Sequence, residues 1–137
     1  MNIHKIANYL NDLGDKSDTG YKFDCTPISG DVDVLRVDVE GREEIPIFVS
    51  VTDEQILCIA YLWGENEVKI EKRVEMLEAM LELNIPMPLS SFAKIGDMYV
   101  VYGALSVQST VADVEHELVV LSDNSLEVIT ELSDYLV

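Results

Sequence analysis

Basic residues are scarce in this chain of 137 residues, which has nine Lys and Arg against 26 Asp and Glu and a formal net charge of −17. Proteins that bind duplex nucleic acid or anionic membranes use Lys and Arg to neutralise phosphates. We therefore expect neither as a partner, whereas a basic protein segment or a cation would suit the charge. The charge also keeps a protein soluble, so recognition does not follow from it alone. No Lys or Arg follows Lys94, which makes the C-terminal third the most negative part.

Cysteine and long apolar runs are scarce as well. The two cysteines, Cys25 and Cys58, lie in apolar stretches and form no CxxC pair, so we expect two reduced thiols in the core. No apolar run reaches the roughly 18 residues that a membrane helix needs. The N-terminal segment lacks the apolar stretch and the small-residue cleavage site of a signal peptide. We therefore expect a cytoplasmic protein that inserts no segment into a membrane.

The motifs that mark catalysis or cofactor binding are missing. The chain has no GxxxxGK phosphate loop, no GxGxxG and no GxSxG. Metal sites favour clustered His and Cys, whereas His4 and His116 are far apart in the sequence. We therefore predict a protein that is not an enzyme, with no catalytic, cofactor-binding or metal-binding residues and no cofactor.

Scattered acidic residues leave an alternative open, which is a small-molecule- or metal-dependent enzyme. On a predicted helix, His116 lies near Asp113, and one imidazole with one carboxylate could hold a cation loosely. Asp31 and Asp33 match a DxD pattern, but the same spacing also marks the solvent side of a strand. Both groupings are typical of a solvated acidic surface too.

The chain has one basic cluster, formed by Lys69, Lys72 and Arg73 at the start of a predicted helix. Positive charge at a helix N-terminus opposes the helix dipole, so another interaction must offset it. One possibility is ordinary pairing with glutamates at helical spacing. The other is contact with carboxylates elsewhere, for instance on the acidic C-terminal helix of the same or another chain.

Hydrophobic spacing predicts a single α+β domain over residues 1–137. The element order is α-β-β-β-β-α-β-β-α, and sequential strands favour a mostly antiparallel sheet with helices packed on it. The predicted helices span residues 3–13, 70–84 and 111–136, and the predicted strands span residues 21–25, 32–39, 45–51, 55–63, 89–95 and 98–105.

Two of these segments carry specific expectations about burial. The strand at 55–63 is apolar on both faces, which predicts a central strand covered on each side. The helix at 70–84 is expected to turn one apolar stripe to the core and a row of glutamates to solvent. The residues that define this side of the helix are Ile70, Val74, Leu77, Met80, Leu81 and Asn84.

Candidate partner-binding residues come from apolar side chains in unusual places and from the acidic C-terminal helix. Trp63 closes the predicted central strand, where it is either core or an interface anchor. Residues 85–92 gather Pro, Met, Leu and Phe in a connection, which is either packed under the sheet or presented to a partner. The residues predicted to contact a partner are Trp63, Met87, Pro88, Leu89, Phe92, Glu115, Glu127 and Glu131.

Several segments resemble the YjfI-like family of small acidic bacterial domains without an assigned function. They are residues 84–93, the Gly96-Asp97 pair followed by Tyr99, and residues 102–106. The resemblance covers residues 45–137 and implies no catalytic residues. Some members are encoded beside phage-shock-protein-A-like membrane-remodelling proteins, which indicates a membrane-stress protein as partner.

The order of elements, the size and the acidity also resemble type III secretion chaperones and their YbjN-like relatives. Those are α+β dimers that bind an unfolded segment of a client, although fold likeness does not fix function. The combined expectation is a homodimeric, non-enzymatic, chaperone- or adaptor-like module that binds a protein partner.

Overall fold

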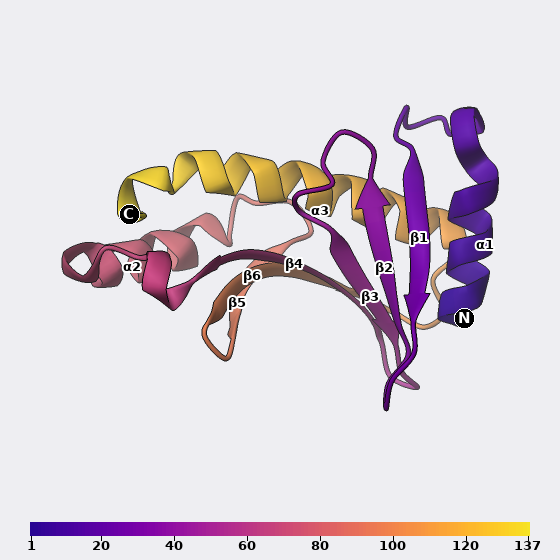
Figure 1. Cartoon of the computed structure of the whole chain (residues 1–137), viewed down its shortest axis with the longest axis horizontal. Coiled ribbons are helices and arrows are strands. Elements are labelled where there is room, and N and C mark those ends of the chain that lie inside the picture. The colour runs from indigo at the N-terminus through magenta and orange to yellow at the C-terminus, as the bar shows by residue number, and fades with distance from the viewer.

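The structure is a computed structural model that describes residues 1–137, apart from the side chain of Asp15. Within these residues, three α-helices and one six-stranded antiparallel sheet follow the order α1-β1-β2-β3-β4-α2-β5-β6-α3 (Figure 1). The predicted α+β class, the antiparallel sheet and the element order are therefore confirmed.

The helices are α1 (Ile3–Leu13), α2 (Arg73–Leu83) and α3 (Val111–Glu131). The strands are β1 (Phe23–Ile28), β2 (Val34–Val39), β3 (Ile47–Val51), β4 (Ile56–Gly64), β5 (Ser91–Ile95) and β6 (Met98–Leu105). Single turns of 3-10 helix flank several of these elements, including Ile70–Lys72 directly before α2.

Across the sheet the strand order is β1-β2-β3-β4-β6-β5. The first four strands form a meander, whereas β4 pairs with β6 and not with β5. The connection through α2 carries the chain past β6 to the far edge, where β5 begins. The predicted central strand is β4, which lies between β3 and β6.

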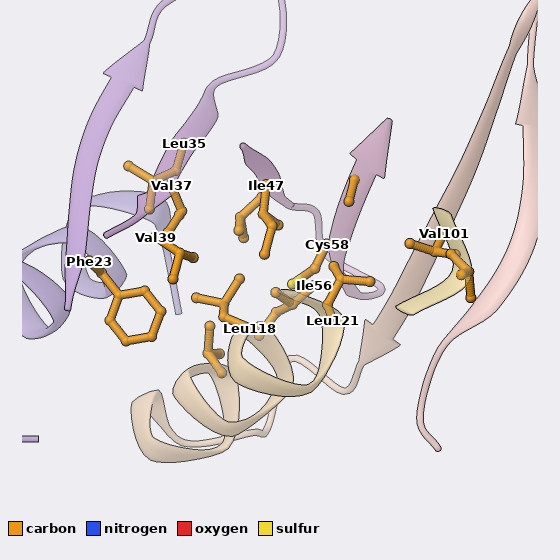
Figure 2. Close-up of a cluster of buried hydrophobic side chains, with 14 of the residues drawn as sticks. Phe23, Leu35, Val37, Val39, Ile47, Ile56, Cys58, Val101, Leu118 and Leu121 are labelled. Atoms are coloured by element: carbon orange, nitrogen blue, oxygen red, sulfur yellow. The ribbon is translucent and has the colours of Figure 1, made fainter. Parts of the chain in front are cut away.

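Helices α1 and α3 pack on one face of the curved sheet and enclose the core with it (Figure 1). Strand side chains alternate between the two faces, and most of those on the helix side are buried. Figure 2 shows Leu118 and Leu121 of α3 among side chains of the strands, including Val39, Ile56 and Cys58. This single layer of helices leaves the other face of the sheet without a covering helix in the described chain.

Both cysteines are free thiols inside the protein, as predicted. Burial raises the pKa of Cys25 to about 12. It also raises the pKa of Cys58, and the nearby carboxyl of Glu117 adds to that shift. Because the thiolate is the reactive form, both thiols are inert at neutral pH.

Strand β1 differs from its prediction at the C-terminal end. The sequence predicts a strand at 21–25 and a turn at 27–30, but the ladder to β2 continues through Pro27 and Ile28. Proline has no N–H to donate, so within a sheet it is tolerated on the side of an edge strand that has no neighbouring strand. Because β1 is the edge of the sheet, the side of the strand away from β2 needs no ladder partner.

Helix α3 ends at Glu131, five residues before its predicted end at 136. The following residues leave the helix to bond with the segment before α2. The N–H of Lys69 donates to the carbonyl of Tyr135 at 2.8 Å, and the N–H of Val137 donates to the carbonyl of Glu67 at 2.8 Å. These backbone bonds replace the helical ones, and they tie the end of the chain to the start of α2.

Candidate functional site

The sheet face turned away from α1 and α3, called here the open face, is apolar at its centre. The ladders align Phe48 of β3 with Ile59 of β4 and Ile59 with Tyr102 of β6. Tyr61 is 38% exposed, and its ring meets that of Phe48 edge to face at 5.9 Å. The open face comprises Val34, Phe48, Leu57, Ile59, Tyr61, Val100, Tyr102 and Ala104.

No described helix covers these side chains. Their partial burial therefore comes from contacts with one another. Val100 is only 1% exposed, yet it lies outside the main core cluster. Its cross-strand neighbours are Tyr61 and Ala93, which share its face of the sheet. An antiparallel sheet that faces water normally alternates apolar and polar side chains. An apolar surface of this kind marks an interaction site more often than a solvated face.

The expectation that β4 is covered on each side is therefore wrong. Its alternate residues Ile56, Cys58 and Ala60 are fully buried under the helices. Leu57 and Ile59 on the other side remain partly exposed. The pattern of the sequence correctly indicated two apolar faces, but periodicity contains no information on whether a second layer exists to cover them.

The turns at both ends of the open face are acidic. One end carries the β1–β2 and β3–β4 turns, and the other carries the β2–β3 and β5–β6 turns. Arg36 is the one base on the open-face side of the six strands, and its guanidinium pairs with Asp38 at 3.2 Å. The acids of the turns are Asp31, Asp33, Asp53 and Glu54 at one end, and Glu40, Glu43, Glu44 and Asp97 at the other.

Four of the predicted partner-binding residues line a hollow of about 210 Å³ between α3 and the loop at 86–90. Met87 and Pro88 come from the loop, and Glu127 and Glu131 come from α3. Asn124 holds the loop in place, since its amide donates to the carbonyl of Pro88 at 2.9 Å. The structure thus brings together residues that lie 39 or more positions apart in the sequence.

Leu89 lies in the same loop with its side chain 59% exposed and its φ angle at 63°. The N–H of Ser90 donates to the carbonyl of Pro88 at 2.8 Å, which makes Leu89 the centre of a three-residue turn. A non-glycine residue in this left-handed region costs about 1–3 kcal/mol. The loop therefore presents a large aliphatic side chain to solvent from a strained backbone.

Replacing Leu89 with glycine is expected to raise the free energy of unfolding by about 1 kcal/mol. Glycine removes the backbone strain, but part of this gain is lost because glycine gives the unfolded chain more conformational entropy. Thermal unfolding of Leu89→Gly measures the effect. Leu89→Ala is the matched control, since it removes the side chain but keeps the unfavourable φ. Equal stabilisation by both substitutions would show that the exposed side chain, not the backbone, is the source of the gain.

The other three predicted contact residues are inside the protein. Trp63 is 3% exposed, Glu115 is 7% exposed and Phe92 is 9% exposed. Trp63 lies on the helix side of β4, with its ring centroid 6.2 Å from that of Tyr99. Of the two meanings that the sequence left open for Trp63, the structure supports core. None of the three forms part of a surface that a partner could reach in this conformation.

Glu115 is buried because it anchors the segment that follows α1. Its carboxylate accepts hydrogen bonds from the hydroxyls of Tyr9 at 3.0 Å and Ser17 at 2.5 Å. Thr19 completes the set at 3.5 Å. A buried carboxylate is stable only when such donors surround it. The sequence predicted that Glu115 lies on the acidic surface of the helix and contacts a partner. In the structure Glu115 is instead inside the protein, where its hydrogen bonds connect α1 and the segment after it to α3.

A hollow of about 890 Å³ lies at the end of β4, beside the first turn of α2. Its central acid is Glu65, which accepts hydrogen bonds from Tyr99 and Arg73 and lies 3.9 Å from the ammonium of Lys94. The bond from Tyr99 and then the guanidinium of Arg73 lower the pKa of Glu65. All four groups are partnered within the chain, so the cluster joins α2 to the sheet.

Glu117 of α3 is the second acid buried against the sheet, with 4% of its surface exposed. Its Oε1 has no hydrogen-bond partner among the described residues. The carboxyl occupies the place of a side chain at Gly103 of β6, where a Cβ would lie 1.6 Å from Oε1. Burial raises the pKa of Glu117, because the charged form is poorly solvated there.

The raised pKa of Glu117 makes stability depend on pH. An acid whose pKa is higher in the folded state contributes stability below its ordinary pKa, and this contribution is lost as the pH rises through the folded-state value. Glu117→Gln stays neutral, so we expect the variant to gain stability over the wild type as the pH rises above about 4.5. Denaturant unfolding of both proteins between pH 4 and 8 measures the difference. Parallel pH profiles would contradict this explanation.

The residues behind the enzyme alternative do not gather into a site. His116 is exposed on α3, and Asp31 and Asp33 are exposed in the β1–β2 turn. Among the residues with described side chains, no group of three or more His, Cys, Asp or Glu is placed to hold a metal ion. In the same residues, no helix combines the length and the apolar character that crossing a membrane requires.

Fold and surface together define a small α+β protein with an antiparallel sheet that is covered on one side and apolar on both. The family model that matches residues 2–136 is described as an uncharacterized protein conserved in bacteria (DUF2170). The chain belongs to this bacterial family. A search of curated proteins finds no match. The family agrees with the expected bacterial protein of unassigned function, but the YjfI-like name and the likeness to secretion chaperones gain no support from it.

Sequence reasoning missed two surfaces. The open face was missed because an apolar strand was assumed to be covered. The second surface is on α2 and the turn before it, where Ile70, Val74 and Leu81 of the predicted core stripe are exposed. Met80 of that stripe is buried as predicted, and Met76, which was not assigned to the stripe, is buried with it. A signal for the second was present, because apolar residues occur all around α2 and a single stripe could not account for them.

Proposed function

We propose that this protein is a non-enzymatic, adaptor- or chaperone-like binding module whose open face holds a segment of a protein partner. The observation that carries the proposal is the apolar centre of the open face, with Phe48, Ile59, Tyr61 and Tyr102 side by side on three neighbouring strands. Aromatic side chains are enriched in protein interfaces, because they bury a large area at a low cost in conformational entropy.

The charges around the open face favour a basic partner segment with apolar side chains between its charges. Acidic turns lie at both ends of the face, and its one strand base, Arg36, is already paired with Asp38. Apolar contacts would supply most of the affinity, while opposite charges at the rim would speed association and select the partner. Binding should therefore weaken with added salt, since rim charges are screened beyond about 10 Å at 0.1 M.

The proposal extends to the setting of the module. We place it in the cytoplasm, as a homodimer, with a membrane-stress protein of the phage-shock-protein-A-like class as a candidate partner. The hollow beside Met87, Pro88 and the exposed Leu89 gives a second contact area for the same partner. The strained turn at Leu89 supports this part of the proposal, because strain is often retained where a side chain has a role in binding.

Site-specific photo-crosslinking in the native host tests the proposal. A benzoylphenylalanine in place of Tyr61 sits on the open face. The same residue in place of Tyr135, in the 3-10 turn after α3 and outside the open face, is the matched control. We expect one basic protein to be cross-linked through position 61 and not through position 135, with a lower yield at higher salt. If position 61 captures no protein at any salt concentration, the proposal is contradicted. A small-molecule ligand would then be the better explanation of the open face.

A further inference from the structure

The loop at 86–90 is attached to α3 through the side chain of Asn124. Its amide donates to the carbonyl of Pro88 and to the hydroxyl of Ser90, both at 2.9 Å. Asn124 and Ser90 are both buried, so the attachment lies inside the protein. The same loop holds Leu89 at a φ of 63° with an exposed side chain. A strained segment of this kind stays in place only while its surroundings keep it there.

The carboxyl of Glu117 adjoins the backbone of this loop. A Cβ at Gly103 of β6 would overlap Oε1 of Glu117 and would lie 3.3 Å from the carbonyl oxygen of Leu89. The two oxygens therefore border the same small space. Neither accepts a hydrogen bond from a described residue. Two acceptors thus lie close together at this point without a donor between them.

The protonation state of Glu117 determines whether these two groups attract or repel each other. A neutral carboxyl has an O–H, which can donate to the carbonyl of Leu89. An ionised carboxyl only accepts, so its charge faces the negative end of the carbonyl dipole, and the repulsion is strong where little water screens it. Glu117 is buried, and this burial raises its pKa. The attached loop therefore favours the protonated acid.

The other groups that face Glu117 do not reverse this effect. The loop at 86–90 has no ionisable side chain. From β4 the thiol of Cys58 faces the carboxyl, and burial raises the pKa of this thiol, so it stays neutral. On α3 the imidazole of His116 lowers the pKa of Glu117, but the effect of burial is larger.

We propose that Glu117 is a proton-dependent latch for the loop at 86–90. The protonated carboxyl holds the carbonyl of Leu89 and keeps the loop attached to α3 and β6. When the carboxyl loses its proton to solvent, it repels this carbonyl and the loop is released, which changes how the Leu89 side chain is presented. The latch requires no partner on the open face, so it stands whether or not that face binds a protein.

The direction of the pH dependence follows from the two states of the loop. The attached loop binds the proton of Glu117 more tightly than the released loop, in which the carboxyl regains contact with water. The attached population is therefore largest in acid, and it falls as the pH rises through the pKa that Glu117 has in the attached state. Each unit of difference in pKa between the two states changes their ratio about tenfold.

Amide hydrogen exchange of the full chain, followed by NMR between about pH 5 and 8, above the ordinary pKa of glutamate, tests the latch. The N–H groups of Met87 and Ser90 report on the loop, because both donate to backbone carbonyls. After correction for the intrinsic pH dependence of exchange, their protection should fall at least about tenfold across this range. The N–H of Lys69, which donates to the carbonyl of Tyr135 outside the loop, should keep its protection.

Three variants identify the responsible group. Glu117→Gln should keep the protection of both loop amides constant, because its side-chain amide can donate to the carbonyl of Leu89 at every pH. Glu127→Gln is the matched control, since it removes an exposed carboxylate of α3 that lines the hollow beside the loop. It should lose protection as the wild type does. His116→Gln should move the loss to higher pH, because the imidazole that favours the ionised carboxylate is gone.

Constant protection of the loop amides in the wild type would overturn the latch. The same loss in Glu117→Gln as in the wild type would also overturn it, as would abolition of the loss by Glu127→Gln. A loss at unchanged pH in His116→Gln would show that a group other than Glu117 titrates, and this outcome decides the question even where Glu117→Gln fails to fold.

Discussion

Replacing Gly103 with alanine is expected to lower the free energy of unfolding by about 2–3 kcal/mol, a cost typical of overpacking in a tight interior. A Cβ at this position would lie 1.6 Å from Oε1 and 2.8 Å from Cδ of Glu117, and 3.3 Å from the backbone carbonyl of Leu89. The carboxyl cannot swing into solvent at no cost, because Glu117 is buried between α3 and the sheet. Helix and sheet would have to separate locally, and denaturant unfolding measures the loss.

Two further variants decide whether the Glu117 carboxyl is the cause. Gly103→Ala combined with Glu117→Ala removes the overlap, so we expect the double variant to be more stable than Gly103→Ala alone. Gly30→Ala is the matched control for the loss of a glycine, because its Cβ would meet nothing closer than a carbonyl at 3.6 Å. If the second substitution added to the loss instead of relieving it, a different contact would be responsible.

Replacing Tyr102 with alanine is expected to weaken binding of the cross-linked partner at least about 30-fold, the effect of losing a central aromatic contact. Tyr102 lies between Ile59 and Ser91 in the middle row of the open face. Its side chain is only partly buried, so the free energy of unfolding should fall by about 1 kcal/mol. Isothermal titration with the purified partner measures the dissociation constant.

Tyr135→Ala is the control for the loss of a partly buried tyrosine outside the open face, in the 3-10 turn after α3. It should leave the dissociation constant unchanged. Wild-type affinity in Tyr102→Ala would show that the partner contacts another surface, and the hollow between α3 and the loop at 86–90 would be the next to test. Loss of affinity in both variants would indicate a general effect on folding.

Much of the fold could be predicted from local patterns. The helix at 3–13 and the strand at 98–105 have the predicted bounds, because each has a clear apolar period and a turn-forming glycine beside it. A capping box of a Thr and an Asp three residues apart begins α3, with reciprocal bonds between Thr110 and Asp113 of 2.8 and 3.1 Å. Such features depend on residues within one turn of one another, which a single sequence contains.

The site was less accessible to prediction, because it depends on contacts between distant residues. Glu117 is buried because Gly103 lies opposite, and Glu115 is buried because three hydroxyls near α1 converge on it. The helical spacing alone would assign both Glu115 and Glu117 to the solvent-exposed side of α3. The exposed side of α2 and the open face were assigned to the core for the same reason, since an apolar residue is normally buried within its own chain.

Helix α3 follows all six strands in the chain, and this order has a consequence for synthesis. Strands β1 to β6 are complete before residue 111, yet the core needs Leu118 and Leu121 from α3 to fill it. A chain emerging N-terminus first therefore presents a sheet that is apolar on both sides until α3 leaves the ribosome. During this interval the nascent protein would be prone to aggregate. A stop codon before α3 should accordingly yield insoluble protein, whereas one late in the 133–137 segment should be far milder.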